Sequence, residues 1–536
     1  MPIVKMPWPW QANTQHTNSD FSCWTSTHGI PHIGMANAIW LRLFWILVVL
    51  ACLIGFLIQL KMLIQKYFSY QVNTETQLLF SERVFPAVTI CHLNPWKADS
   101  LGGSKYMQDL VAAYNSSVAN TNFGFDDGRT GERQQRAVKL AAMANQELFG
   151  DTPNPEYTYD DIVISCTYNA IPCNETDFAQ TQDPNFGLCQ EFNYNSVYKS
   201  SRAGPLYGLR VVMMTDQANY LPWTEASGVV VSIHDAADPP YPDVLGYYAP
   251  PGTASSMGVR FVSTTREGPP YGTCTSAGYV TMEHYSGKYE VEACFRNCLQ
   301  VHIIENCGCY DPTYSFNNKT SSSSCYQGAT AETATSNNLD CIEGIENSDG
   351  TSGFNLITDC NCPQPCKVDT YSVTVSTAQW PSDAYTPSAC TQSNQTGAPW
   401  LANPTDPANE ALCLSWYKTN TLLVEIYYER MNYQVLTESP AYTVVNLVSD
   451  IGGQVGLFLG MSIISVIELF TLVLLLIWYC TTHKQRRLEL EGVEDTAKQE
   501  QENTKNLSQL NKKNPAQNKP IYDHGKDDVV PPAVHD

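Results

Sequence analysis

Residues 456–478 read GLFLGMSIISVIELFTLVLLLIW, an apolar run of membrane-spanning length, since about 20 apolar residues cross a bilayer. Its one formal charge is Glu468, and a carboxylate near mid-membrane costs roughly 2.5–3.5 kcal/mol. One interpretation is a packing helix that tolerates one acid. The other is a pore helix, in which Gly460 and Ser462 narrow a water-filled path and Glu468 attracts cations.

A second apolar run lies near the N-terminus, at residues 43–60 (LFWILVVLACLIGFLIQL). It lacks the cleavage site of a signal peptide and is flanked by Arg42, Lys61 and Lys66, as a membrane anchor is. Two spans place both termini on one side of the membrane. The basic cluster at 483–487 indicates the cytosolic side, whereas Lys61 and Lys66 argue the other way with less weight.

Cysteine placement decides the orientation. Of the 19 cysteines, Cys23, Cys52 and Cys480 lie before, within or beside the apolar runs, and the other sixteen lie between them. An even, dense set of cysteines is typical of an oxidising compartment. The same region holds four glycosylation sequons, at Asn115, Asn174, Asn318 and Asn394. We therefore expect a two-pass plasma-membrane protein with a large extracellular region.

The composition excludes several functions. The formal net charge is −22, so a nucleic-acid partner is not expected, and an acidic ectodomain attracts cations near its clefts. No nucleophile–base constellation, P-loop or dinucleotide fingerprint is present, so we expect neither an enzyme nor a cofactor. The close-spaced cysteines at 294–366 could ligate zinc, but the compartment, the Cys-x-Cys spacing and the sparse histidine favour disulfides and no metal.

Local patterns predict a β-rich body with helical additions. Alternating or continuous apolar runs rich in β-branched and aromatic residues predict strands at 84–93, 209–213, 228–233 and 421–431. Helical spacing predicts helices at 134–149 and 289–304, the second with Cys294 and Cys298 on one face. The Ser/Thr/Asn/Gly-rich region 321–359 is expected to form loops.

Several short motifs, each weak alone, occur in a specific order. They are His28-Gly29; FPAVTIC at 85–91 followed by Asn94-Pro95; Gly187-Leu188-Cys189; Tyr271-Gly272-Thr273-Cys274; the cysteine array at 294–366; Trp380-Pro381-Ser382; Tyr427-Tyr428 with Asn432-Tyr433; and DIGGQ at 450–454 leading to Gly460-Met461-Ser462. In this order they resemble the degenerin/epithelial sodium channel superfamily from about residue 29 to residue 468. The segments around His28 and residues 67–74 are most similar to the invertebrate FMRFamide-gated sodium channels.

The resemblance implies an α+β membrane protein that assembles as a trimer around one pore. Each subunit would have two transmembrane helices and a disulfide-rich ectodomain of palm, β-ball, finger, knuckle and thumb. The implied boundaries are a cytosolic N-terminus with a re-entrant segment (1–40), transmembrane helix 1 (41–66), an extracellular domain (67–448, finger about 97–185, thumb about 288–366), transmembrane helix 2 (449–480) and a disordered cytosolic tail (481–536).

Family pairing also implies a disulfide framework. It would join Cys91–Cys189, Cys166–Cys173, Cys274–Cys366, Cys294–Cys362, Cys298–Cys360, Cys307–Cys341 and Cys309–Cys325. Cys390 and Cys413 remain, and we expect them to pair with each other, so that all sixteen extracellular cysteines are used.

Carried over by position, the resemblance assigns roles along the second span. Gly460, Met461 and Ser462 match the family's Gly-x-Ser selectivity filter. Ser449, Asp450 and Gly453 fall in the gate, and Gly456 falls at the amiloride-contact position. His28 and Gly29 would line the lower pore, with Glu468 as a cation-attracting ring below the filter.

The sequence leaves several alternatives for the stimulus that opens the channel. Acid-sensing members carry a histidine pair after the first helix, whereas residues 67–72 here read YFSYQV; histidine is the natural switch near neutral pH. The resemblance therefore favours an amidated, FMRFamide-type peptide over protons or constitutive opening. Its cationic and aromatic groups would bind carboxylates and rings in the finger, at Tyr157, Tyr159, Asp160, Asp161 and Phe178, unless these are ordinary surface and packing residues. A non-conducting receptor with two anchors is the alternative of another class.

Overall fold

The computed structural model describes residues 25, 27–117, 130–147, 155–276, 282–285, 288–317, 322–326, 338–346, 353–391, 409–474, 477–478 and 498–505. They belong to two compact units, a helical unit (Met1–Ser69 with Thr443–Asp536) and a β unit (Tyr70–Tyr442). Asn318, Asn394, Cys23 and Cys480 lie outside the described residues. Within the tail expected to be disordered, residues 498–505 are helical. The rest of 481–536 lies outside the described residues.

The helical unit contains the two apolar segments. Its helices are α2 (Ile30–Met35), α3 (Ile39–Tyr67), α13 (Val444–Leu459) and a further helix at Ile463–Leu474. Among the described residues α3 alone is long and apolar enough to span a membrane, and α13 with Ile463–Leu474 passes the same test as one segment bent by 76°. Helix α3 packs closely on α13, because a Cβ added at Gly55 would lie 2.8 Å from the Phe458 ring.

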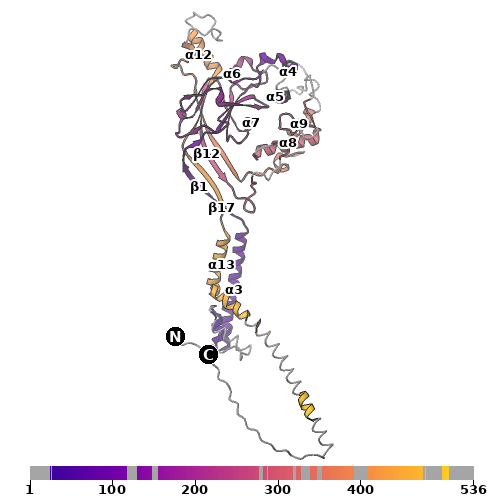
Figure 1. The fold of residues 1–536 in the computed structure, drawn as a ribbon, viewed down its shortest axis with the longest axis vertical. Helices are drawn as coiled ribbons and strands as arrows, with labels where there is room; N and C mark the ends of the chain where they lie inside the picture. The colour runs from indigo at the N-terminus through magenta and orange to yellow at the C-terminus, as the bar shows by residue number, and fades with distance from the viewer. Residues whose placement is uncertain are drawn as a thin grey trace, which may run out of the picture. The chain divides into compact units, whose positions relative to one another are not determined.

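The β unit is built on a sheet with the strand order β1-β17-β12-β16-β9-β4-β5, in which β15 also pairs with β12. The middle strand β12 has three partners. Strand β15 pairs with it along its whole length, whereas β16 pairs with residues 254–259 and β17 with residues 262–265. Figure 1 shows β1, β17 and β12 running side by side. The strands are β1 (Val72–Phe80), β4 (Val163–Tyr168), β5 (Ile171–Pro172), β9 (Leu209–Met214), β12 (Thr253–Thr265), β15 (Lys367–Gln379), β16 (Thr421–Tyr428) and β17 (Asn432–Pro440).

A second sheet has the order β11-β10-β3-β7-β6. Strands β3 and β10 are buried at every residue, as expected of central strands covered on both faces. The strands are β3 (Ala87–His92), β6 (Phe178–Asp183), β7 (Gly187–Phe192), β10 (Val229–His234) and β11 (Gly246–Ala249); two short pairs, β2 (Arg83–Val84) with β8 (Lys199–Ser200) and β13 (Cys309–Tyr310) with β14 (Ser323–Ser324), stand apart.

Two hydrophobic cores organise the β unit. The first joins the two sheets, with Val88 and Val231 packed in one cluster with Val211, Met257 and Val424. The second joins the helices α4, α5, α8 and α9, which gather at one side of the β unit in Figure 1. The helices are α4 (Lys105–Ser117), α5 (Thr130–Glu147), α6 (Tyr159–Ile162), α7 (Pro242–Leu245), α8 (Val291–Cys307), α9 (Asn338–Glu346), α10 (Leu356–Asp359), α11 (Ser388–Thr391) and α12 (Asn409–Asn420), with 3-10 turns at Ala98–Gly103, Glu175–Asp177, Pro205–Tyr207 and Gln217–Asn219.

Eight disulfides staple the β unit. They are Cys91–Cys189, Cys166–Cys173, Cys274–Cys366, Cys294–Cys362, Cys298–Cys360, Cys307–Cys341, Cys309–Cys325 and Cys390–Cys413. These pairs coincide with the expected ones. One face of α8 carries Cys294 and Cys298, and these bridge to two cysteines only two residues apart, so the helix is fixed against one return segment.

The structure corrects several sequence-based boundaries. The strand expected at 84–93 divides into β2 and β3 around Pro86, because proline has no N–H for a ladder. Strand β16 ends at Tyr428 rather than 431, and α8 runs three residues past 304. The region 321–359 is not all loop, since it holds β14, α9 and α10.

Candidate functional site

The second apolar segment breaks at Gly460. Helix α13 ends at Leu459, and Gly460 adopts the left-handed conformation, with φ 60°, which suits glycine better than any residue with a Cβ. Ser462 then caps the following helix, because its Oγ accepts a hydrogen bond from Ser465 N–H at 3.4 Å and its own N–H donates to Ser465 Oγ at 3.1 Å. Gly460, Met461 and Ser462 therefore form the whole break between the two helices.

The segment that precedes α2 packs against this break. The His28 N–H donates to the Leu459 carbonyl at 3.2 Å, which satisfies one of the carbonyls left unpaired at a helix end. The His28 ring occupies the space beside Gly460, where an added Cβ would lie 1.4 Å from His28 Nδ1. Gly29 also needs its freedom, because it has φ +87° and a Cβ there would lie 2.5 Å from Val49. The predicted filter and re-entrant segment thus meet in one place.

Glu468 lies on the helix after the break, and a residue of the N-terminal segment donates a hydrogen bond to its carboxylate. Thr25 Oγ1 donates to Glu468 Oε2 at 3.5 Å. Farther along, the His32 ring stacks on Trp45 of α3 with centroids 4.4 Å apart. The structure therefore brings Thr25 and His28 against the second apolar segment, a proximity that no local pattern reveals.

The predicted gate and amiloride-contact residues lie on α13. Ser449, Gly453 and Gly456 follow one another at intervals of four and three residues, so they share a helix face. All three are exposed on a single chain, as is Asp450. An added Cβ at Gly453 would meet no atom within 4 Å, so the described part of this chain leaves open space beside that residue.

The structure corrects the predicted peptide pocket in the finger. Tyr157, Tyr159 and Phe178 are only 2%, 8% and 8% exposed and belong to the core between the two sheets. Asp161 caps the short helix α6 through the Thr158 N–H at 2.8 Å and pairs with Lys97 Nζ at 2.7 Å. Asp160 alone is exposed. Four of the five residues therefore pack or cap, because rings beside strands fill the core more readily than they line a surface.

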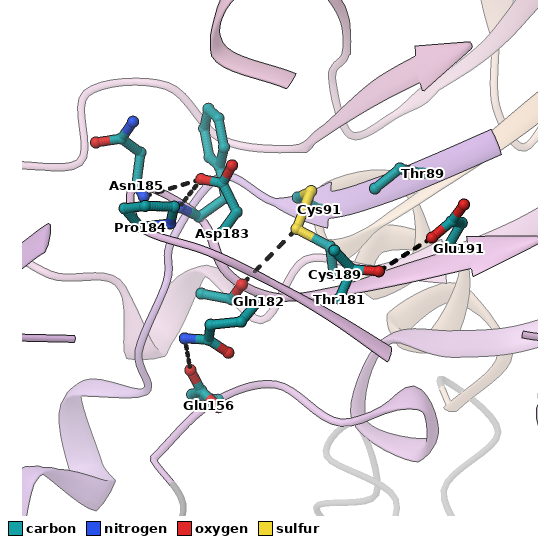
Figure 2. The surroundings of a disulfide bond; sticks show 12 residues. Thr89, Cys91, Glu156, Thr181, Gln182, Asp183, Pro184, Asn185, Cys189 and Glu191 are labelled. Carbon is teal, nitrogen blue, oxygen red and sulfur yellow. Dashed lines mark hydrogen bonds between the residues drawn. A yellow bond between two sulfur atoms is a disulfide. The ribbon is translucent and has the colours of Figure 1, made fainter. Parts of the chain in front are cut away.

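A cluster of carboxylates, which the sequence did not single out, lies at the β6–β7 turn. Figure 2 shows Asp183 near the Cys91–Cys189 disulfide. Its carboxylate accepts hydrogen bonds from the Asn185 N–H at 2.9 Å and the Phe186 N–H at 3.0 Å. Burial, and next the nearby Asp243, raise the pKa of Asp183 to about 6. Glu156, drawn in the same view, accepts from Gln182 Nε2 at 2.7 Å, and burial raises its pKa.

Arg296 links this cluster to helix α8. Its Nη2 donates to both oxygens of Asp243 at 2.9 and 2.8 Å, and its Nε donates to Glu292 at 2.7 Å. The guanidinium carbon lies 4.7 Å from the centre of the Tyr241 ring. The Glu292–Arg296 spacing of four residues on a helix was the one signal in the sequence that could have located this site.

The same surface continues to Asp238 and Glu290. Asp238 is 7% exposed and pairs with Lys288 Nζ at 2.6 Å. Burial, and next the charge of Asp238, raise the pKa of Glu290 to about 7. The charge of Lys288 offsets only part of this rise, so Glu290 titrates near neutral pH. No group of three His, Cys, Asp or Glu side chains in the described part of the chain is arranged to hold a metal ion.

One aromatic contact lies wholly within the β unit. The rings of Tyr70 and Tyr271 meet edge to face with centroids 5.4 Å apart. This is a favoured geometry for an aromatic pair, so the two rings hold the start of the β unit, just before β1, against the segment that follows β12.

Two apolar segments, one of them broken at Gly-x-Ser, and a disulfide-stapled β unit define the class: a membrane channel with a β-rich ectodomain. The chain belongs to the amiloride-sensitive sodium channel family, whose model matches residues 21–472. It is therefore a member of a family of plasma-membrane sodium channels and not an enzyme.

Similar curated proteins include degenerins of nematodes. The chain is 31% identical to degenerin-like protein asic-2 of Caenorhabditis elegans over 86% of its own length and 87% of that protein. It is 38% identical to degenerin-like protein unc-105 over 71% of its length and 39% identical to degenerin del-1 over 58%, both from the same organism. The chain spans only 39% and 44% of those two proteins.

Proposed function

We propose that this chain is the pore-forming subunit of a sodium-selective, amiloride-sensitive cation channel that opens when an extracellular amidated peptide binds. The observation that carries the proposal is the break of the second apolar segment at Gly460–Ser462, with His28 bonded to the last carbonyl of α13. A simple anchor needs neither a left-handed glycine nor a second segment of chain folded against it.

The channel is proposed to be a homotrimer with both termini cytosolic. Three copies of residues 460–462 would surround one axis, where exposed carbonyls and Ser462 hydroxyls replace part of the hydration shell of Na⁺. Glu468 would form a ring of three carboxylates below this filter and raise the local cation concentration. Ser449, Asp450 and Gly453 would gate the path from above, and amiloride would bind at Gly456.

Peptide gating rests on the resemblance of residues 28–31 and 67–74 to FMRFamide-gated channels and on the lack of a histidine pair at 67–72. The buried aromatic residues of the finger no longer support a pocket there. The proposed stimulus is therefore an arginine-containing amidated peptide, and its binding surface lies in the ectodomain without an assignment to particular residues.

Acid is the second candidate stimulus, and a specific observation favours it. Asp183 and Glu290 have pKa values raised to about 6 and about 7, so both gain protons when the pH falls below neutral. Protonation would remove two negative charges beside Arg296 and Lys288 and would weaken the attraction across the base of the thumb. Carboxylates could thus sense acid here without a histidine pair.

Recording from cells that express this chain alone tests the proposal. We expect micromolar Phe-Met-Arg-Phe-amide to evoke an inward Na⁺ current that amiloride blocks. Current on acidification without a peptide response would instead identify the acid-gated alternative. Absence of current under both stimuli, with the chain present at the cell surface, would leave the non-conducting receptor as the better reading.

The variant Gly460→Ala addresses the carrying observation directly. A Cβ there would collide with the His28 ring and strain a positive φ, so we expect loss of Na⁺ selectivity or of current at normal surface expression. Gly344→Ala is the matched control, because Gly344 lies in helix α9 and an added Cβ meets no atom within 4 Å. Wild-type selectivity in Gly460→Ala would contradict the assignment of residues 460–462 to the filter.

A further inference from the structure

His92, the last residue of β3, is a buried histidine whose two ring nitrogens both face backbone carbonyl oxygens. The residue is 1% exposed. Nδ1 lies 2.8 Å from the carbonyl oxygen of Asn94, and Nε2 lies 2.9 Å from the carbonyl oxygen of Thr215, which follows β9. A carbonyl oxygen only accepts hydrogen bonds, whereas a neutral imidazole carries a single N–H. The neutral ring therefore cannot donate to both carbonyls.

One tautomer of the neutral ring still gives each nitrogen a partner. With the proton on Nε2, the ring donates to Thr215, and Nδ1 accepts a hydrogen bond from the Asn94 N–H at 3.2 Å. The Nδ1 lone pair then faces the Asn94 carbonyl oxygen at 2.8 Å, which is a repulsive contact. In the imidazolium both nitrogens carry protons, so both carbonyls accept charge-assisted hydrogen bonds. The backbone around His92 is thus arranged to hold the charged ring as well as the neutral one.

Two tyrosines enclose the His92 ring. The Tyr157 ring lies against it with centroids 4.0 Å apart, and the Tyr220 ring meets it edge to face at 5.4 Å. Burial raises the pKa of both phenols, that of Tyr220 to about 12. Neither tyrosine is therefore ionised in the range where a histidine titrates. The face of an aromatic ring attracts a cation, so the Tyr157 ring favours the imidazolium.

Asp216 supplies a negative charge that acts on the His92 ring. Its carboxylate also accepts a hydrogen bond from Asn219 Nδ2 at 2.8 Å. Burial is the largest effect and lowers the pKa of His92 below its usual 6.5, although the two carbonyls and the Asp216 carboxylate favour the charged form. His92 is therefore neutral at neutral pH and takes up a proton on acidification.

The other charged groups on the neighbouring segments have partners of their own. Lys97 pairs with Asp161 at 2.7 Å, and Glu156 accepts a hydrogen bond from Gln182 at 2.7 Å. The charge of Asp99 acts on the stacked tyrosine. In the part of the chain that the structure describes, none of these side chains is hydrogen-bonded to the histidine ring, so the ring's own partners are the two carbonyls and one N–H.

Asn94 connects the His92 site to helix α5. Its side-chain amide donates to the Trp96 carbonyl at 2.6 Å, and its side-chain oxygen accepts from the Leu221 N–H at 2.9 Å. Trp96 in turn donates from Nε1 to Asn145 of α5 at 2.8 Å. A proton on His92 therefore acts at the point where the end of β3, the end of β9 and α5 are joined.

We propose that His92 is a proton-binding site that acidification fills, in which the imidazolium donates hydrogen bonds to the Asn94 and Thr215 carbonyls. The bound proton adds a charge-assisted hydrogen bond at the junction of β3 and β9. The site uses a different group from Asp183 and Glu290. Because the inference concerns proton binding by the β unit, it holds whichever stimulus opens the channel.

The test is the thermal unfolding midpoint of the purified full-length protein from pH 8 to pH 4, compared with that of His92→Gln. A glutamine amide keeps one donor and one acceptor and does not titrate. The pKa of the unfolded histidine is 6.5 and that of the folded one is lower, so the unfolded state gains its proton first. The wild type should lose about 2 °C relative to the variant for each pH unit below 6.5. This loss should level off once folded His92 is protonated.

His92→Asn is the second variant, because it also does not titrate but keeps different contacts. The two variants should have parallel pH profiles even where their midpoints at pH 8 differ, which separates the proton from the loss of packing. A wild-type loss that continues to pH 4 without levelling would mean that folded His92 binds no proton. Parallel profiles for the wild type and both variants would mean that folding does not affect its titration. Either result would overturn the proposal.

Asp216→Asn tests the charge beside the ring. Asp216 has φ 42°, a left-handed conformation that asparagine also adopts, so the substitution removes the charge and keeps the backbone. The levelling should move to lower pH. Asp383→Asn is the matched control, because Asp383 pairs with Lys418 on an exposed surface, and it should level at the wild-type pH.

An equal levelling pH in Asp216→Asn and the wild type would show that the group that levels the profile is not His92, and would also overturn the proposal. None of these measurements requires current. Failure of peptide gating or of acid gating would therefore not be mistaken for failure of this site.

Discussion

Two charge clusters in the β unit each place one lysine beside two carboxylates, but they differ in the exposure of the lysine and in hydrogen bonding. In the first, Lys139 of α5 lies 2.7 Å from Asp311 and 2.7 Å from Glu346 of α9. Asp311 is fully buried and also accepts hydrogen bonds from the N–H and hydroxyl of Thr313. In the second, Asp238 and Glu290 share the single cation Lys288 beside a cavity.

The difference separates a structural cluster from a candidate functional one. Burial alone would lower the pKa of Lys139, but the charges of Asp311 and Glu346 hold it above its usual value, so this lysine is permanently charged and fully compensated. Glu290 instead has its pKa moved to about 7. The buried Lys139 cluster joins α5 to α9, whereas Glu290, whose pKa lies at about 7 beside a cavity, can respond to protons.

The largest effect is expected from Lys139→Met. It leaves two acids facing each other without a cation, and removal of one partner from a buried ion pair destabilises by about 3–5 kcal/mol. We expect a correspondingly lower midpoint of thermal unfolding for the purified full-length protein. Lys418→Met, which breaks an exposed pair, should leave the midpoint unchanged. Equal shifts for the two variants would show that the Lys139 cluster is not a lock.

Glu290→Gln should have a smaller effect that depends on pH. The pKa of Glu290 is raised when the protein folds, so the stability this group contributes is full below its unfolded value of 4.5 and is lost as the pH rises through about 7. The neutral variant avoids that loss, so it should be more stable than the wild type by about 1–2 kcal/mol at pH 8, once partial solvent screening is allowed for.

The measurement for Glu290→Gln is the thermal unfolding midpoint at pH 4.5 and at pH 8. The two proteins should agree at the lower pH and diverge at the higher one. A constant difference between them at both values would mean that Glu290 does not titrate in this range, and the acid-sensing alternative would lose one of its two carboxylates.

The smallest effect is expected at the exposed pair of Arg260 and Glu429. Arg260 is about half exposed, and exposed ion pairs contribute about 0–1 kcal/mol because water and salt screen them. Arg260→Met should therefore change the unfolding midpoint little at low salt and not at all at high salt. If Arg260→Met lowers the unfolding midpoint as much as Lys139→Met does, burial does not distinguish the Lys139 cluster from an exposed ion pair.

Much of the architecture could be predicted from the sequence, because the signals are local or topological. Apolar length predicted the segment containing α3, and β-branched runs predicted β9, β10 and β16. The resemblance supplied the partners of the cysteines, which spacing alone could not, and the left-over pair Cys390–Cys413 followed by elimination. Helical spacing of Cys294 and Cys298 correctly placed them on one face, because that period is a property of the helix itself.

The ligand residues could not be predicted in the same way. Tyr157 and Phe178 read as aromatic contacts for a peptide, yet they fill the core between the sheets. Whether a ring is buried depends on which strands cover it, and those strands come from parts of the chain far apart in sequence. Likewise, Asp238, Tyr241 and Lys288 show no motif, and only folding gathers them around one cavity.

The sequence by itself determined the two apolar segments, the Gly-x-Ser interruption and the membership of a sodium channel family, because each depends on residues that are close together or that follow a fixed order along the chain. Only the tertiary structure decided that the His28 ring fills the place of a side chain at Gly460, that two acids hold Lys139 charged, and that burial beside Asp238 raises the pKa of Glu290. Those outcomes depend on distances between groups up to some 430 residues apart, and electrostatic and steric energies follow the distance in space.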